Sequence, residues 1–544
     1  TPIKSSAASD VYKRQIQIFA VAAMALAAVA CTDTWDEHYG NESRPVSDKS
    51  LLQVMEEQGD LGDFLKVLRA THVFSNNKPT KVTYADLLAS DQTFTVWAPK
   101  DGQFNVDSLL AECQTVSGDS MCGQHFVQNH IAHFITNSTD EKQVLMLNNK
   151  YLDAVPGSFQ GVSYASGRVN GAAKNGVLHV LSGGVPYLYN IYEALTTLSG
   201  YSGVGSFFKG YEKLELDENA SIQSGIVDGN IVYSDSVMNI TNILFGWFDR
   251  INEEDSSFIM LVPENRVWDK VYNEALSYFN YGSVNQADSL QRLYAHQAVI
   301  RDLVYNRKYG CAHMEDSVCS IAYSKYDEER RHVYYNPLAS GGIFSSDFVR
   351  DTMACSNGAI YNLHEWPFKP EDIYFYPVKT EAEYESMMTD YKDCTYASRF
   401  SAADSISDGY LVISPRTNSS NWTMEFQIPS VLSGTYDICA VVLPRTVYNA
   451  TDRNFRPCKF KASIGYETVD GIEQSFDFED EVKNDPYRVD TVKIGTFTIP
   501  VCSYGQPNAK VHLTLECSIS RMESGRYNRE MYLDCLYFKP NREE

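Results

Sequence analysis

Residues 93–104 read Thr-Phe-Thr-Val-Trp-Ala-Pro-Lys-Asp-Gly-Gln-Phe, and this stretch decides the fold of the middle of the chain. It opens with aromatic and β-branched residues, which favour a buried strand. Pro99 has no backbone N–H to donate to a neighbouring strand, so the strand should end there. The polar residues that follow predict a turn and then the start of a helix.

A second copy of this pattern lies further along the chain. Residues 257–263 read Ser-Phe-Ile-Met-Leu-Val-Pro, with Pro263 in the place of Pro99. Each copy is followed by an Asn-Gly pair before an apolar run, which is typical of a turn that leads into a strand. The two pairs are Asn175-Gly176 and Asn357-Gly358. The sequence therefore predicts an internal repeat.

The two copies differ in length. Their prolines (99 and 263) are 164 residues apart and their Asn-Gly pairs (175 and 357) are 182 residues apart, so the second copy carries 18 additional residues. We expect this surplus near residues 307–335, because that stretch is charged and shows little pattern of a core.

The first copy resembles the fasciclin (FAS1) domain. Residues 93–104 resemble the first signature of that family, and residues 175–181 resemble the second. Between them, residues 126–134 resemble the central helix of the family, with His130 in its histidine position. The resemblance implies a compact α+β unit, here residues 47–192, that serves adhesion or protein–protein contact and carries out no reaction.

The second copy is a weaker match to the same family. Tyr361 stands where the first copy has His179, and the segment around residues 294–305 has no clear counterpart of His130. We therefore expect residues 193–378 to form a degenerate second FAS1 domain, in which any ligand that depends on those histidines is lost.

From about Lys379 the sequence changes to short strands separated by turns. Eight strands at this spacing are typical of an antiparallel sandwich or jelly roll. Residues 434–438 and 531–538 resemble galactose-binding-like jelly rolls, many of which are carbohydrate-binding modules. The predicted fold is therefore multidomain: two α+β FAS1 domains followed by an all-β jelly-roll sandwich at residues 379–544. The expected strands are residues 410–413, 422–428, 435–443, 459–465, 474–478, 491–499, 510–516 and 531–538.

The N-terminus resembles a bacterial lipoprotein signal. Residues 1–15 look like translated adaptor sequence, and residues 16–30 form a short apolar run that ends in small residues before Cys31. The resemblance to a lipobox implies removal of residues 1–30 and acylation of Cys31, whose acyl chains would anchor the chain at about 0.8 kcal/mol per buried CH₂. Residues 31–46 would form an acidic flexible tether, like those of Bacteroidetes lipoproteins sent to the outer cell face. A plain secretory signal with a chance cysteine, or a buried helix, is the alternative.

Charge and motifs narrow the function. With 70 Asp and Glu against 46 Lys and Arg, the net charge of −24 disfavours nucleic acid as a partner. No metalloprotease, nucleophile-elbow or P-loop motif occurs, so we expect neither an enzyme nor a cofactor. The leading hypothesis is a lipid-anchored outer-membrane protein, facing the cell exterior, that binds glycan or scaffolds a receptor–transporter complex for glycan uptake. An adhesin that binds protein through its FAS1 domains is the alternative, and a glycan-active enzyme with two catalytic carboxylates is the third hypothesis.

Trp422 and two aspartates are the candidate binding residues of the sandwich. Trp422, flanked by amide and hydroxyl side chains, would stack on a sugar ring, although the same residue also suits the start of a core strand. Asp404 and Asp408 in the preceding loop would offer oxygen ligands to Ca²⁺, although a solvated loop fits them as well.

The histidines and cysteines have structural explanations. His130 and His133 lie three residues apart on the predicted helix and would meet a metal on one face, but no third ligand is apparent. We therefore expect His130 and His179 to be core residues. Two close cysteine pairs would each close a small disulfide loop worth about 2–3 kcal/mol, or stay reduced. They are Cys113 with Cys122 and Cys311 with Cys319.

Overall fold

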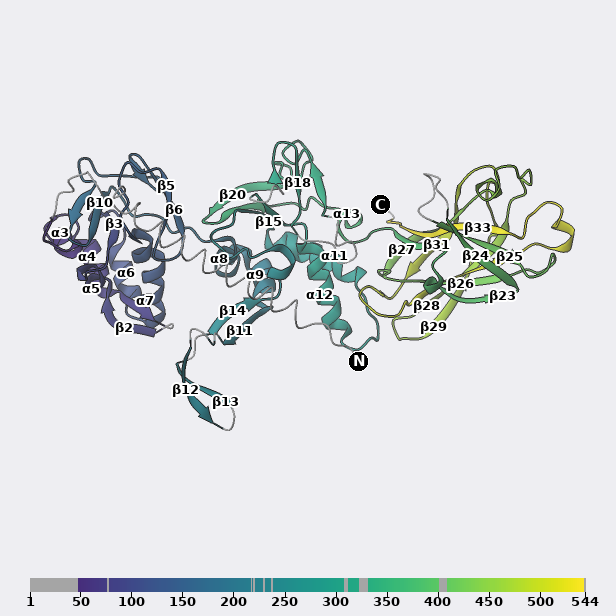
Figure 1. Ribbon diagram of the computed structural model, residues 1–544, viewed down its shortest axis with the longest axis horizontal. Helices are drawn as coiled ribbons and strands as arrows, with labels where there is room; N and C mark the ends of the chain where they lie inside the picture. The colour runs from purple at the N-terminus through teal and green to yellow at the C-terminus, as the bar shows by residue number, and fades with distance from the viewer. Residues whose placement is uncertain are drawn as a thin grey trace, which may run out of the picture. The chain divides into compact units, whose positions relative to one another are not determined.

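The computed structural model describes residues 47–75, 78–216, 218, 221–227, 230–235, 238–307, 312–321, 331–400 and 409–542. The chain divides into two compact units, Thr1–Tyr187 and Leu188–Glu544 (Figure 1). Cys31 and its tether, Cys311, Asp404 and Asp408 lie outside the described residues. None of the described helices is long and apolar enough to cross a membrane.

The first unit is built on a four-stranded sheet in the order β4-β3-β10-β9. The strands are β4 (Ile131–His133), β3 (Phe94–Pro99), β10 (Gly176–Leu181) and β9 (Gly171–Ala173). β3 and β10 run parallel, with Phe94 opposite Gly176 and Pro99 opposite Leu181. The strand predicted from residues 93–104 is therefore confirmed, and it ends at its proline.

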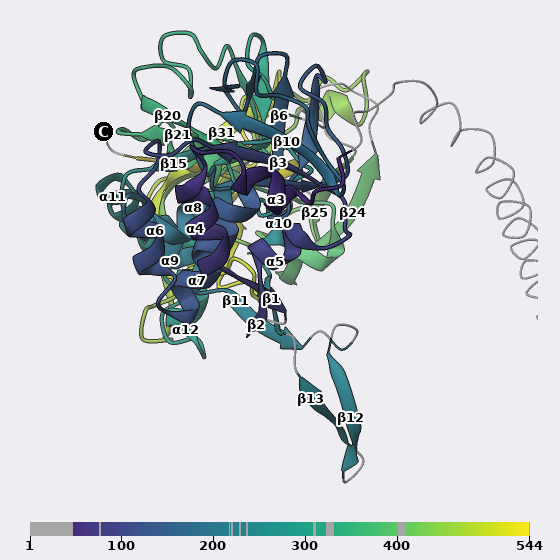
Figure 2. The same cartoon turned by 90° about the vertical axis from the view of Figure 1, so that its left-hand side faces the viewer.

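Helices and a small sheet cover the two faces of this sheet. Figure 2 shows α4 (Gly62–Ala70), α6 (Val106–Glu112) and α7 (Val116–Cys122) on one side of β3 and β10. Val96 packs into the apolar cluster on this side, whereas Trp97 packs on the opposite side against Phe159, with ring centroids 4.1 Å apart. The remaining elements are α3 (Leu51–Glu56), β1 (His72–Ser75), β2 (Lys78–Thr83), α5 (Tyr84–Ala89), β5 (Lys142–Leu145), β6 (Tyr151–Val155), β7 (Ser158–Phe159) and β8 (Val162–Ser163).

The second unit begins with a sheet of the same design, in the order β16-β15-β21-β20. The strands are β16 (Val304–Asn306), β15 (Phe258–Pro263), β21 (Gly358–Leu363) and β20 (Val349–Cys355). β15 and β21 are again parallel, with Phe258 opposite Gly358 and Pro263 opposite Leu363. The matching order and register confirm the internal repeat.

Further elements surround the second sheet. The helices are α8 (Ile191–Thr197), α9 (Ser202–Lys209), α10 (Phe245–Phe248), α11 (Asn265–Tyr278), α12 (Ala287–Ile300) and α13 (Pro370–Ile373). Between α9 and α10, where the first unit has the short β1–β2 hairpin, stand two strand pairs that extend as an arm (Figures 1 and 2). They are β11 (Glu212–Leu216) with β14 (Met238–Asn242) and β12 (Ile222–Val227) with β13 (Asn230–Asp235). A small sheet contains β17 (Ala312–His313), β18 (Ser317–Cys319) and β19 (Val333–Tyr335).

The 18 surplus residues of the second copy are shared between two segments. Ile131 pairs with Val96, and Val304 pairs with the equivalent Met260. From Pro99 to Ile131 the chain advances 32 residues, and from Pro263 to Val304 it advances 41, so nine of the 18 lie in the helical segment. There α11 has 14 residues against seven for α6, whereas α12 with 14 residues matches α7 together with the helical turns Gly123–Val127 and Gln128–His130 that continue it. The prediction that placed the whole surplus near residues 307–335 was therefore only half right.

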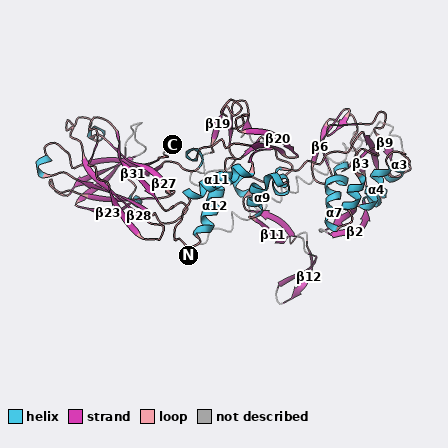
Figure 3. Cartoon of the chain, turned by 180° about the vertical axis from the view of Figure 1, so that it is seen from behind, coloured by secondary structure: helices cyan, strands magenta, loops and turns pink. Residues whose placement is uncertain are grey.

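The last part of the second unit is a sandwich of two antiparallel sheets, which Figure 3 shows as strands and loops with short helical turns. One sheet has the order β24-β25-β33-β27-β31 with β22 beside β33, and the other has the order β23-β26-β32-β28-β29 with β30 beside β28. All eight predicted strands are present. They are β25 (Gly409–Pro415), β26 (Thr423–Ile428), β27 (Gly434–Val442), β28 (Lys459–Glu467), β29 (Glu473–Asp477), β31 (Asp490–Ile499), β32 (Val511–Cys517) and β33 (Met531–Pro540). The sequence missed β22 (Val378–Glu381), β23 (Met388–Lys392), β24 (Cys394–Phe400) and β30 (Val482–Lys483).

The second repeat and the sandwich share one apolar core. The loop between α11 and α12 makes the polar contacts: Asn280 O accepts from Cys502 N at 2.6 Å, and the Tyr281 hydroxyl donates to Tyr504 O at 2.8 Å. Ser433 N donates to Tyr278 O at 3.0 Å. These two parts are therefore joined by packing as well as by the chain.

Candidate functional site: a polar hollow on the β-sandwich

The sandwich contains a shallow hollow of about 10 Å³, enough for about one water molecule, where the ends of strands from both sheets meet. It is lined by residues that leave β27, precede β28, follow β30 and lead into β33. We call it the Arg456 hollow. Its main lining residues are Leu443, Arg445, Asn454, Arg456, Asn484, Pro486, Asn528, Glu530 and Tyr532.

Tyr532 and Glu530 form the floor of the Arg456 hollow. Tyr532 is buried in a small apolar cluster with Tyr410 and Leu443. Burial, together with the neighbouring Glu530, raises the pKa of the Tyr532 phenol, so its hydroxyl stays protonated. That hydroxyl donates to Glu530 Oε2 at 3.0 Å, and the Ser414 hydroxyl donates to Glu530 Oε1 at 3.1 Å. Both carboxylate oxygens are thus held in place.

Two arginines enter the hollow with different partners. Arg445 lies between two carboxylates, with Nη2 3.0 Å from Glu530 Oε2 and Nε 3.1 Å from Asp452 Oδ2. Arg456 donates from Nε to Asn454 Oδ1 at 2.7 Å and from Nη1 to Ser524 O at 2.9 Å. No ion pair of Arg456 occurs within the described residues. The two arginines and the two carboxylates of Glu530 and Asp452 together carry no net charge.

Two aromatic residues are next in sequence to residues that line the hollow. Phe455 stacks on Tyr487, with ring centroids 4.8 Å apart, and Tyr487 is 70% exposed. Each is adjacent in sequence to lining residues, Phe455 to Arg456 and Tyr487 to Pro486. An exposed ring beside a few fixed polar groups is the arrangement by which proteins bind sugars, because the sugar offers both C–H faces and hydroxyls.

Trp422 does not contribute to this site, which corrects the predicted sugar contact. Its side chain is 0% exposed, and its indole Nε1 donates to Arg529 O at 2.6 Å. A ring with no exposed face cannot stack on a ligand. The tryptophan packs in the sandwich core at the start of β26, which was the other explanation of its sequence context.

A second polar cluster lies near the start of the sandwich, where two acidic side chains are buried. Glu383 is 6% exposed, and neither of its carboxylate oxygens has a hydrogen-bond partner. Asp534 is 4% exposed, and its Oδ1 has no hydrogen-bond partner. Burial raises the pKa of both carboxyls, and each is also raised by the charge of Glu381. Glu381 itself contacts Lys379, with Oε1 2.8 Å from Nζ.

This cluster has the chemistry of a hard-cation site, although it is not a formed one. Its donors are all carboxylate oxygens, which Ca²⁺ prefers. Among the described residues, however, no three His, Cys, Asp or Glu side chains are already arranged around a common point. The predicted calcium ligands Asp404 and Asp408 lie outside the described part of the chain.

The two histidines of the FAS1-like motif are core residues. His130 is buried; its Nδ1 donates to Phe126 O at 2.7 Å, and its Nε2 accepts from Val185 N at 2.9 Å. Burial lowers the pKa of His130 to about 4, so the ring is neutral. His179 Nε2 is 2.9 Å from Thr136 O, and burial lowers its pKa as well.

The imidazole pair considered for metal binding is not formed. The helical segment ends at His130, and His133 lies on β4, where it is exposed and stacks on Phe94 with ring centroids 5.4 Å apart. Pairing of β4 with β3 ends the helix four residues earlier than the predicted helix at residues 126–134. In the second repeat the register places Leu303 at the position of His130, which agrees with the predicted lack of a counterpart.

The Asn-Gly pairs hold each repeat together. Asn175 Oδ1 accepts from Leu51 N at 2.7 Å, and its Nδ2 donates to Leu88 O and Ser90 O. Asn357 does the same in the second repeat, accepting from Ile191 N at 2.9 Å and donating to two carbonyls, those of Ile251 and Glu253. Each asparagine therefore fixes the start of a helix to the start of a strand. The bond to Ile191 also places α8 with the second repeat, across the predicted boundary at residue 192.

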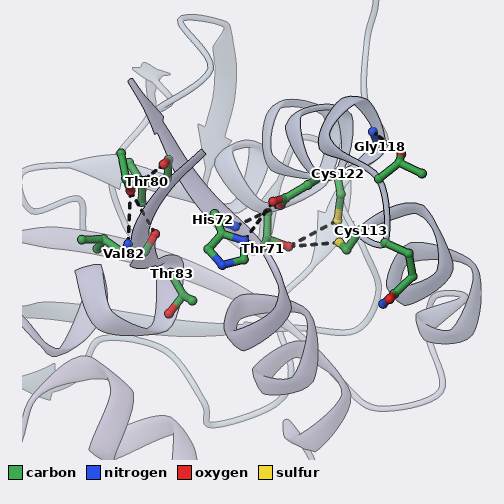
Figure 4. Close-up of polar contacts among 12 residues, drawn as sticks. Thr71, His72, Thr80, Val82, Thr83, Cys113, Gly118 and Cys122 are labelled. Atoms are coloured by element: carbon green, nitrogen blue, oxygen red, sulfur yellow. Dashed lines mark hydrogen bonds and ion pairs between the residues drawn. The ribbon is translucent and has the colours of Figure 1, made fainter. Parts of the chain in front are cut away.

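Cys113 and Cys122 lie side by side at the ends of α6 and α7 (Figure 4). Both are thiols in this structure, and each sulfur is 3.5 Å from the hydroxyl of Thr71. Burial raises the pKa of the Cys122 thiol to about 12. Cys311 lies outside the described residues, so its pairing with Cys319 stays a prediction.

We expect mild oxidation to join Cys113 and Cys122 in a disulfide that stabilises the first unit by about 2–3 kcal/mol. The reaction should be faster at alkaline pH, because the buried Cys122 is a thiol at neutral pH. Peptide mass spectrometry would detect the loss of two hydrogens. Cys122→Ser is the control, and two alkylatable thiols after prolonged oxidation would contradict the prediction.

No family model and no curated protein matches the chain. Among solved structures, a FAS1 domain pair of the insect cell adhesion molecule fasciclin I is 15% identical, covering 58% of this chain and 99% of that chain with a TM-score of 0.20. A family 22 carbohydrate-binding module from Clostridium thermocellum is 11% identical, covering 31% and 94% with a TM-score of 0.20. A xylan-binding domain from Paenibacillus barcinonensis is 11% identical, covering 31% and 96% with a TM-score of 0.21.

Two larger proteins are matched over a small part of their own length. The chain covers 28% of a Clostridium thermocellum xylanase that combines a carbohydrate-binding and a catalytic module, and 16% of a Paenibacillus xanthan lyase. The TM-scores of these two likenesses are 0.20 and 0.22.

Proposed function

We propose that this chain is a non-catalytic cell-surface protein that binds glycan on the surface of its β-sandwich around Tyr487. The observation that carries the proposal is the exposed Tyr487 ring, which stacks on Phe455 and is next in sequence to a residue that lines the polar Arg456 hollow. The two FAS1-like repeats then serve as the stalk and as surfaces for protein contact. A lipid at Cys31 would hold the chain on the outer membrane, where a receptor–transporter complex for glycan uptake is the fitting partner.

Adhesion to a protein is the second candidate function. It is favoured by the arm of the second repeat, where Leu214 on β11 is 67% exposed and stands opposite Ile240 of β14. Two-stranded ribbons are marginally stable alone, and an exposed apolar residue on one suits contact with a partner. Binding to immobilised protein that survives excess oligosaccharide would favour this function over glycan binding.

We expect the chain without residues 1–30 to bind a subset of glycans on an array, and Tyr487→Ala to weaken that binding about threefold to tenfold. Loss of an aromatic stacking partner costs about 0.5–1.5 kcal/mol. Titration calorimetry on a bound glycan would give the two affinities. Tyr335→Ala is the matched control, because Tyr335 is equally exposed but lies on β19 of the second repeat. The proposal fails if no glycan binds or if both variants bind like the unchanged chain.

We also infer that Glu383 and Asp534 help to hold a divalent cation, for which Ca²⁺ is the best match. Buried carboxylates without hydrogen-bond partners are costly, and a bound cation would remove that cost. The cation would act on the stability of the sandwich and take no part in a reaction. Glu383 and Asp534 do not line the Arg456 hollow, so failure to bind a cation would leave the proposed glycan binding unaffected.

A further inference from the structure

The arm of the second repeat exposes one edge of a regular ribbon (Figure 1). β11 and β14 pair at five consecutive positions without a bulge, from Glu212 opposite Asn242 to Leu216 opposite Met238. In the described part of the chain, β14 is the only strand that pairs with β11. The other edge of β11 therefore offers N–H and C=O groups to a further strand.

The two other two-stranded ribbons carry features that hinder such pairing. β2 of the first repeat contains Pro79, and its register with β1 shifts between His72 and Phe74. The register of β12 with β13 also shifts. Proline and bulges are common means by which proteins protect an edge strand. β11 has neither, and its Leu214 and Leu216 are 67% and 36% exposed.

The sequence of β11 is complementary to itself. Residues 212–216 read Glu-Lys-Leu-Glu-Leu. In an antiparallel pair with Leu214 opposite Leu214 of a second copy, Lys213 lies opposite Glu215 and Glu215 lies opposite Lys213. Both charged side chains are exposed, and neither takes part in an ion pair within the described residues. Opposite charges that face each other across antiparallel strands are favourable, whereas like charges are unfavourable.

The two faces of this pair would be different. Side chains alternate along a strand, so the two Leu214 side chains would meet on one face and the two ion pairs would form on the other. The net charge of −24 on each copy opposes association, but charges farther apart than about 8 Å are screened at physiological ionic strength. The contact therefore depends on the pairs that meet directly.

We propose that β11 pairs with β11 of a second copy of this chain, so that two arms form a four-stranded sheet about a two-fold axis. The strand order of this sheet is β14-β11-β11-β14. The proposal goes beyond glycan binding, because it concerns a surface of the second repeat, and it gives the exposed apolar residues of the arm a copy of the chain as their partner. Two five-residue strands bury less area than a stable interface needs, so the dimer is weak and reversible.

Exchange of the two charges tests this pairing. Sedimentation velocity of the chain without residues 1–30, over about a hundredfold range of concentration, should show a monomer–dimer equilibrium. Lys213→Glu or Glu215→Lys should each raise the dissociation constant about tenfold or more, because each places two like-charge pairs in the contact. An equimolar mixture of these two variants should dimerise again, since the chain with two acidic residues then meets the chain with two lysines. The double variant should dimerise like the unchanged chain.

A matched control makes the same charge change elsewhere. Lys81→Glu, on an exposed position of β2 in the first repeat, should leave the dissociation constant unchanged. An unchanged melting temperature shows that each variant is folded. A chain that stays monomeric at every concentration, or a dimer that both single exchanges leave intact, overturns the proposal. A mixture of the two single variants that stays monomeric overturns the pairing of Lys213 with Glu215. Binding on the glycan array is measured separately and is expected to be the same for all these variants.

Discussion

Replacing Gly358 with alanine is expected to unfold the second repeat, with a loss of about 4–5 kcal/mol or more in the free energy of unfolding. Gly358 has φ +145°, and a Cβ there would lie 1.9 Å from Phe258 O on the parallel strand β15. The close approach allows β21 to start its pairing with β15, so neither strand can move away without losing the sheet. Thermal unfolding followed by circular dichroism would measure the loss.

The first repeat offers the same experiment. Gly176 has φ +152°, and its Cβ would lie 1.9 Å from Phe94 O, so Gly176→Ala should damage β3 and β10 in the same way. Hydrogen exchange read by mass spectrometry would show loss of protection in the altered repeat. Gly200→Ala is the control, since no atom lies within 4 Å of its would-be Cβ and its φ is not in the left-handed range. A Gly358→Ala protein with an unchanged melting temperature would contradict the close approach of β21 to Phe258 O.

Glu383→Gln is expected to stabilise the sandwich by about 1–3 kcal/mol in a chelator at pH 7, and to abolish stabilisation by Ca²⁺. The raised pKa of the Glu383 carboxyl means that the folded protein holds this proton more tightly than the unfolded chain does. The resulting stabilisation is full below the ordinary carboxyl pKa and is lost as the pH rises through the raised value. Above that raised pKa the buried charge therefore costs stability unless a cation compensates it.

Melting temperatures measured between pH 4 and pH 8, with Ca²⁺ or with chelator, would test this expectation. The unchanged chain should melt higher with Ca²⁺ at pH 7, and in chelator it should gain stability as the pH falls toward 4. Glu473→Gln, at an exposed carboxylate of β29, should behave like the unchanged chain. If Ca²⁺ leaves the melting temperature of the unchanged chain where it was, Glu383 and Asp534 do not hold this ion.

The local parts of the fold were predictable because the sequence carries them in short patterns. Pro99 and Pro263 end their strands because proline has no backbone N–H to donate. The second residue of each Asn-Gly pair has a positive φ that favours glycine. Period-two burial along β26 and β32 likewise marks strands that bury one face. The predicted sugar contact of Trp422 was wrong. A side chain at the start of a strand can face the core or the solvent, and the local sequence does not decide between the two.

The candidate sites could not be predicted, because distant segments build them. Arg445, Arg456, Tyr487 and Glu530 come from four separate turns of the sandwich, and none stands in a pattern of its own. Glu383 and Asp534 are brought together only by the register of β22 on β33, in which Glu381 faces Cys535 and Ala382 N bonds to Asp534 O. The sequence gives no sign of this register. A polar residue within a strand, as Asp534 is, was the one available hint.

The bonds from Asn280 and Tyr281 to the turns of the sandwich have a mechanical consequence. If the sandwich binds a polysaccharide as proposed, a force on that ligand would reach the second repeat through a packed, hydrogen-bonded interface and not through a flexible linker. Stripping the sandwich from the repeat under tension would require water to enter a continuous apolar interior.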